Sequence, residues 1–214
     1  MVEQLLRYKV AYVELNLTNV PDYCNAQIYP QTVYPRLQRH QTKPEIAILT
    51  VSVDPATPGF QPFNISVLAT ASTVKGPLGL LNLIKPSDDS TSISLTTGYY
   101  SNFILNYLPF YEILPLQHLE VPMNLTSFAN ADAFVQTDIL EPPVNWSINI
   151  TSDIIIKPGD TELFLLSITP PNVQNEVRTT LIRFNISAWE HPEYGYDVLI
   201  APITIRVFHG LLFC

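Results

Sequence analysis

The chain has 214 residues, of which 47% are hydrophobic and only 14% charged, and its net charge is −8. This length is enough for one large or two small domains that each bury a core. The acidic balance argues against a nucleic-acid partner, which needs a basic surface, and no apolar run reaches the ~18 residues of a membrane span. Glycans on the surface would explain how a chain with so little charge stays soluble.

The N-terminal strand has an alternating pattern that changes phase within a continuous run. Up to Tyr12 one face holds apolar side chains and the other holds Arg7 and Lys9, whereas from Val13 onward the apolar side chains take the opposite parity. A shift by one residue predicts a bulge, or two strands with different partners. In the second case residues 1–12 add a strand to a sheet of a neighbouring subunit, while residues 13–18 pair within their own subunit. The alternative is a first strand that pairs inside its own sandwich.

The rest of the chain has the pattern of an all-β protein. Helical periodicity is nearly absent, 19 prolines punctuate the sequence, and short β-branched runs recur between turn residues. Residues 75–89 are predicted to be a loop with a short turn of helix, and residues 99–125 to be short strands and turns. The clear strands are predicted over 45–53, 63–72, 92–97, 145–151, 161–170, 179–189 and 201–210.

A change in composition over residues 127–143 places a domain boundary there. We therefore expect a β-sandwich domain over 13–130 and an immunoglobulin-like β-sandwich domain over 131–214. The second domain resembles the immunoglobulin-like modules of secreted prokaryotic proteins, over residues 134–208, in two motifs. These are the tight turn Lys157-Pro158-Gly159-Asp160 between two strands and the later Pro170-Pro171 pair. A resemblance of this kind implies a fold and no function.

Six N-x-[ST] sequons mark candidate N-glycosylation sites, against roughly two expected by chance. The six sequons share one sequence pattern, in which the acceptor asparagine lies between alternating apolar residues of a predicted strand. In VNWSINIT, for example, Trp146, Ile148 and Ile150 share one face and both acceptors share the other. Alternating strands alone can produce such a motif, but they do not explain the excess of outward asparagines. The acceptors are Asn16, Asn64, Asn124, Asn145, Asn149 and Asn185.

The remaining residues whose side chains could take part in a reaction or bind a metal give little sign of catalysis. Cys24 and Cys214 are expected to form a disulfide if the chain is secreted; the alternative is two buried free thiols. The four histidines show no metal-ligand spacing, and no nucleophile elbow or phosphate-binding glycine loop occurs. No catalytic residue, metal or cofactor is therefore predicted, and the chain is not expected to be an enzyme.

The overall design resembles the subunits of archaeal thread filaments, which are glycosylated surface polymers. The likeness lies in a sequon-rich, low-charge, all-β chain that begins with the apolar strand VEQLLRYKVAYVEL. It implies an extracellular subunit that joins identical subunits head to tail by donor-strand complementation. The donor side chains that would fill a groove in the next subunit are Leu6, Tyr8, Val10 and Tyr12.

Three functional readings follow in order. The first is a structural subunit of a cell-surface filament, N-glycosylated and serving adhesion or cell–cell contact. The second is a secreted or surface-layer-associated module that binds carbohydrate or another cell, with aromatic residues between Tyr99 and Tyr111 as a sugar platform; such residues are more often core. The third is a viral capsid protein, which the β content also permits.

Overall fold

The structure is a computed structural model that describes residues 12–35, 44–72, 74–75, 82–84, 86–173, 175–194 and 196–208. The chain divides into two compact units, Met1–Thr97 and Gly98–Cys214. Regular structure in the described residues is β-strand apart from one short 3₁₀ helix, η1 (Pro192–Tyr194). The prediction of an all-β, immunoglobulin-like β-sandwich chain is therefore confirmed.

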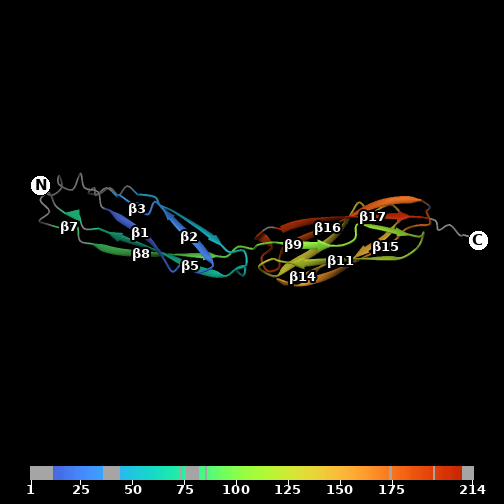
Figure 1. Cartoon of the computed structure of the whole chain (residues 1–214), viewed down its shortest axis with the longest axis horizontal. Helices are drawn as coiled ribbons and strands as arrows, with labels where there is room; N and C mark the ends of the chain where they lie inside the picture. Colours follow the sequence, from blue (N-terminus) through green and yellow to red (C-terminus); the bar gives the residue numbers. More distant parts are fainter. Residues whose placement is uncertain are drawn as a thin grey trace, which may run out of the picture. The chain divides into compact units, whose positions relative to one another are not determined.

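The described strands of the first unit, blue to green in Figure 1, form one four-stranded sheet and two two-stranded sheets. A four-stranded sheet has the order β3-β1-β5-β8, and β2 pairs with β4 in a separate two-stranded sheet. A short hairpin, β6–β7, completes the described strands. Their bounds are β1 (Val13–Thr18), β2 (Cys24–Tyr29), β3 (Thr32–Val33), β4 (Ile48–Val53), β5 (Pro62–Ala71), β6 (Val74–Lys75), β7 (Asn82–Ile84) and β8 (Ser87–Thr96).

The second unit has a five-stranded sheet of order β10-β17-β16-β12-β14 and a four-stranded sheet of order β13-β15-β11-β9. Its pairs are antiparallel except β10–β17, which is parallel. The strand bounds are β9 (Phe103–Asn106), β10 (Phe110–Ile113), β11 (Leu119–Ser127), β12 (Ala133–Leu140), β13 (Ser147–Ile150), β14 (Ile154–Ile156), β15 (Thr161–Thr169), β16 (Glu176–Ala188) and β17 (Tyr196–Val207).

The structure corrects the expected position of the domain boundary. The division lies between Thr97 and Gly98 and not at 130/131, because β9 and β11 pair with each other and β11 pairs with β15. The change in composition at 127–143 instead falls where the chain passes from the four-stranded sheet to the five-stranded one. Within the segment predicted to be a loop with a helical turn, the described residues 82–84 and 87–89 are strand, and residues 76–81 lie outside the described part of the chain.

Alternation along the strands produces the core of the second unit. Inward residues of the two sheets meet in one fully buried cluster, at whose centre Phe164 and Phe184 pack edge to face with ring centroids 5.3 Å apart. Each such buried side chain contributes about 1.5–3 kcal/mol relative to exposure. The predicted turn is present as well: the Asp160 N–H donates to the Lys157 carbonyl at 3.1 Å, and Gly159 supplies the positive φ of 83°.

The first unit buries far less of its interior. Among its described apolar side chains only Phe63 and Ile65 are buried, with 8% and 0% of their surface exposed. The ring of Tyr23 contacts Phe63 at 6.0 Å. The other inward aliphatic residues are half-buried: Val13, Leu15, Leu17, Ala26, Ile28, Leu49, Val51, Val53, Ile93 and Leu95.

Candidate functional site

Five of the six sequon asparagines lie on the outward faces of the sheets, and Asn145 lies in a turn. Asn16, Asn64, Asn124, Asn145 and Asn149 are exposed, and Asn185 is half-exposed. Each strand places its apolar residues inward by alternation, as in β11, where Val121, Met123 and Leu125 are buried and Asn124 is not. All six acceptors are thus accessible from solvent to some degree, and their occupancy by glycans stays a prediction.

Asn145 departs from the expected strand conformation. It lies in a turn with φ of 65°, and the strand β13 begins only at Ser147. Asn is one of the few residues that adopt this left-handed conformation at low cost. Trp146, Ile148 and Ile150 still pack against the core, as the alternation predicted.

Asn64 lies beside hydroxyl residues of β8 on an outward sheet face. Its side-chain oxygen accepts a hydrogen bond of 2.7 Å from the Ser94 hydroxyl on β8. Ser94 is also its cross-strand partner, and the neighbouring pairs bring Ser92 and Thr96 to the same strand edge. The bond orients the amide, whose nitrogen is the atom that would carry a sugar.

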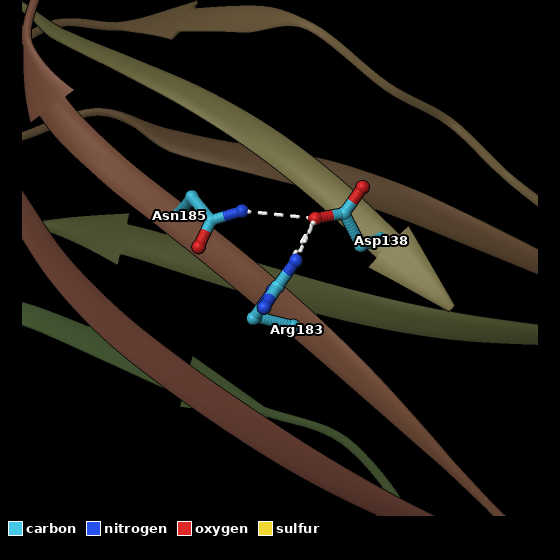
Figure 2. A network of polar contacts seen from close by, with 3 residues as sticks. All are labelled: Asp138, Arg183 and Asn185. Atoms are coloured by element: carbon cyan, nitrogen blue, oxygen red, sulfur yellow. Dashed lines mark hydrogen bonds and ion pairs between the residues drawn. The ribbon is translucent and has the colours of Figure 1, made fainter. Parts of the chain in front are cut away.

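Asn185 belongs to a polar network on the five-stranded sheet (Figure 2). Its amide nitrogen donates to Asp138 Oδ2 at 3.0 Å, and Arg183 donates to the same oxygen from Nη2 at 2.6 Å. Arg183 and Asn185 lie on β16 and Asp138 on the adjacent β12. An amide nitrogen that carries a sugar keeps one N–H, so this hydrogen bond is compatible with modification.

The same network perturbs the Asp138 carboxyl. Hydrogen bonding from Arg183, followed by its charge and by the Asn185 hydrogen bond, outweighs desolvation and lowers the pKa of Asp138. A carboxyl whose folded pKa is lowered stabilises the fold above its unfolded pKa of about 3.9 and loses that contribution as pH falls through the folded value.

We therefore expect Asp138→Asn to destabilise the second unit at pH 7 and to have no such effect at a pH below the folded pKa. The group is exposed, so the effect is small. Thermal melts of the two proteins from pH 7 down to pH 2 measure it: the two Tm curves should converge in acid. A constant Tm difference across this range would show that the carboxylate charge plays no part.

The predicted donor residues fall mostly outside the described part of the chain. Leu6, Tyr8 and Val10 are among the residues that the structure does not describe. Tyr12 is described, and it stays in its own chain: its carbonyl accepts from the Ser72 N–H at 2.9 Å and from the Ser72 hydroxyl at 3.1 Å. Its ring packs edge to face on Tyr34 at 5.9 Å. Tyr12 therefore extends the β1–β5 pairing within its own chain, and the donor role of all four residues stays a prediction.

A groove opens in the first unit between β1 of the four-stranded sheet and β2 of the β2–β4 sheet. The cavity measures about 510 Å³ and is lined by β1, β2 and the turn after β2. Four of the lining side chains are the inward aliphatics Leu15, Leu17, Ala26 and Ile28; the others are Asn16, Gln27, Tyr29 and Gln31. Sequence patterns did not reveal this groove, because alternation indicates which face is inward and not how completely it is covered.

Cys24 is a half-buried thiol in β2, and burial raises its pKa. Its expected partner, Cys214, lies outside the described residues, so the disulfide stays a prediction. A raised pKa disfavours the thiolate, which is the nucleophilic form.

The aromatic residues of the proposed sugar platform do not share one face. Tyr107 and Tyr111 pack against the core of the second unit, whereas Tyr100 and Phe110 are exposed, at 43% and 50%, on separate segments. The histidines that are described make local polar contacts, His118 with Thr169 at 3.1 Å and His191 with Glu193 at 3.2 Å. Over the described ranges no group of three or more His, Cys, Asp or Glu has the arrangement of a metal site.

Comparisons with known proteins show no family. No family model matches the chain, and no curated protein matches it. Among solved structures, a PapD-like domain of human CEP192 covers 50% of this chain and 86% of its own, with 8% identity and a TM-score of 0.41. The match to a protein of unknown function from Porphyromonas gingivalis W83 covers 92% of this chain and 85% of that protein's chain, with 12% identity and a TM-score of 0.35. In the described residues no helix is long and apolar enough to cross a membrane.

Proposed function

We propose that the chain is a structural subunit of an extracellular cell-surface filament that carries N-linked glycans and serves adhesion or cell–cell contact. Subunits join head to tail, with the N-terminal segment of one subunit inserted as a strand into the first unit of the next. Such heterologous contacts propagate into a filament when the rotation does not close.

The observation that carries this proposal is how little of the interior of the first unit its described strands cover. An immunoglobulin-like sandwich of the simplest kind pairs a four-stranded sheet with a three-stranded one. In the described residues of the first unit the four-stranded sheet is complete, but the opposing sheet has only β2 and β4. One added strand would supply the missing element and cover the half-buried Leu15, Leu17 and Ile28.

The N-terminal segment has the composition that such a strand needs. Leu6, Tyr8 and Val10 alternate with Arg7 and Lys9, so an extended segment would present one apolar face to the groove and one charged face to solvent. Burying three side chains at about 1.5–3 kcal/mol each gives a joint of roughly 5–9 kcal/mol before ordering costs are subtracted. Added main-chain hydrogen bonds fix its register.

The outward asparagines support an extracellular, glycosylated surface. Their side chains lie on faces that are not needed for the core, and the described residues carry few charges to solubilise a polymer. Glycans at these positions would separate neighbouring filaments and keep the sheet faces from associating.

Negative-stain electron microscopy of the protein isolated intact from its native surface tests the proposal. Thin filaments are expected from the unmodified chain, and Val10→Asp is expected to abolish them by placing a charge on the apolar face of the inserted strand. Lys9→Asp, on the opposite face, is the matched control and should leave filaments intact. Discrete monomers of the unmodified protein at high concentration would overturn the filament function.

A further inference from the structure

The second unit carries exposed aliphatic side chains on the outward faces of both sheets. On the four-stranded sheet these are Ile104, Leu163 and Leu165, with 49%, 48% and 36% of their surface exposed. On the five-stranded sheet they include Val198 and Ile200, at 44% and 56%. Contiguous apolar side chains on a sheet face are a liability for association unless something covers them.

The strand register places a sequon asparagine at the centre of the first of these patches. Asn124 on β11 is directly opposite Leu163 on β15. The same ladder pairs Leu165 with Pro122, and the ladder on the other side of β11 pairs Ile104 with Thr126, two residues away from Asn124 in each case. Directly opposed residues have Cβ atoms about 4.5–5.5 Å apart and diagonal ones about 7–8 Å, so the Asn124 side chain contacts or borders all three aliphatics.

A second asparagine occupies the equivalent position on the other sheet. Asn185 on β16, the middle strand, is directly opposite Val198 on β17, and Ile200 is opposite Arg183 two residues away. On the far side the register brings the half-buried Phe134 opposite Ser187. Each outward face of the second unit thus has a sugar acceptor with an exposed apolar residue directly opposite it on one neighbouring strand and a polar residue, Asn106 or Gln136, opposite it on the other.

We propose that the first sugars attached to Asn124 and Asn185 fold back onto these aliphatic patches and cover them. This inference rests on the proposed glycosylation and adds to it a specific function for two of the six acceptors. A pyranose ring has faces of C–H groups that pack on aliphatic and aromatic side chains, while its hydroxyls remain in water. Because the sugar is tethered next to the patch, its effective concentration there is in the millimolar range or above. A contact of low affinity is therefore enough to keep the sugar on the patch.

Asn64 provides an internal contrast. Its neighbours on the adjacent strand β8 are Ser92, Ser94 and Thr96, all hydroxyl residues, so a sugar at this position has no aliphatic side chain opposite it on that strand. Removal of the Asn64 glycan should therefore expose no apolar surface, whereas removal of the Asn124 glycan should expose Ile104, Leu163 and Leu165.

The test uses the glycoprotein expressed in its own host and compares Asn124→Gln, Ser187→Ala and Asn64→Gln. Ser187→Ala removes the Asn185 sequon and leaves the Asn185–Asp138 hydrogen bond in place. Site occupancy is first measured by mass spectrometry of glycopeptides, and binding of the apolar dye anilinonaphthalene sulfonate is then measured at matched folded content by circular dichroism. Dye fluorescence is expected to rise several-fold for the first two variants and to stay unchanged for Asn64→Gln. Adding Leu163→Ser to Asn124→Gln should remove the gain at that site.

Two results would overturn the inference in distinguishable ways. Unmodified Asn124 and Asn185 in the native protein would contradict the glycosylation itself. Full occupancy at these sites with equal dye binding in all the variants would leave glycosylation standing and show that the sugars do not cover the patches.

Discussion

A chain that lacks residues 1–11 should fold as a monomer whose first unit melts at a lower temperature than it does in the filament. The truncation ends before Tyr12, whose carbonyl is bonded to Ser72 and which is therefore part of the β1–β5 ladder. Electron microscopy should show no filaments, because the segment proposed to fill the groove of the neighbouring subunit is gone. The second unit, with its buried core, should melt as before.

A synthetic peptide of residues 1–12 should restore the missing strand in trans. At about 100 times its Kd a ligand stabilises the folded state by about 2.7 kcal/mol. For a unit of this size that corresponds to a rise of about 10–20 °C in Tm. Differential scanning calorimetry of the truncated chain with the peptide would resolve the first-unit transition. A peptide with serine at Leu6, Tyr8 and Val10 keeps the main-chain hydrogen bonds and removes the apolar burial, and it should produce little of this rise.

Two results would contradict this mechanism. Filaments formed by the truncated chain would show that the joint lies elsewhere. A peptide that leaves both calorimetric transitions unchanged would show that the groove beside Leu15, Leu17, Ala26 and Ile28 does not accept the segment.

Alternation in the sequence predicted much of the fold and most of the outward surface. The period of two assigned Asn16, Asn64, Asn124 and Asn149 to outward faces, and all four are exposed. It failed at Asn145, because a residue in a left-handed turn does not follow the strand period. The domain boundary failed for a related reason, since the passage from β11 to β12 joins two sheets of one sandwich and looks in the sequence like a linker.

The register between paired strands decides which residues become neighbours at these sites. This register cannot be predicted from the pattern of any one segment of the sequence. Asp138 and Asn185 are 47 positions apart, yet share a hydrogen bond because β12 and β16 are neighbours. Leu163 faces Asn124 because β11 and β15 pair with that particular alignment. The sequence also could not predict that the described strands leave the interior of the first unit only half-buried. The reason is that β2 and β4 have the same alternating pattern as strands in a complete sandwich.

The difference in packing between the two units predicts a large difference in their response to the same kind of core substitution. Phe184→Ala removes a fully buried ring that packs edge to face on Phe164, and should cost about 3–5 kcal/mol in the free energy of unfolding of the second unit. Phe63→Ala, in the first unit of the free subunit, should cost less, because its surroundings are half-buried and can relax into the space. Urea unfolding of each variant, followed by a probe in each unit, measures both values.

The aromatic pair also gives the prediction an internal check. A double-mutant cycle on Phe164 and Phe184 should show a coupling of about 0.5–1.5 kcal/mol, the contribution of edge-to-face contact beyond burial. Leu163→Ala, one residue along β15 but on the outward face, is the matched control and should change stability by much less. Equal costs for Phe63→Ala and Phe184→Ala in the free subunit would mean that the first unit is already as well packed as the second. Its groove would then need no added strand, and the joint between subunits would have to be sought on another surface.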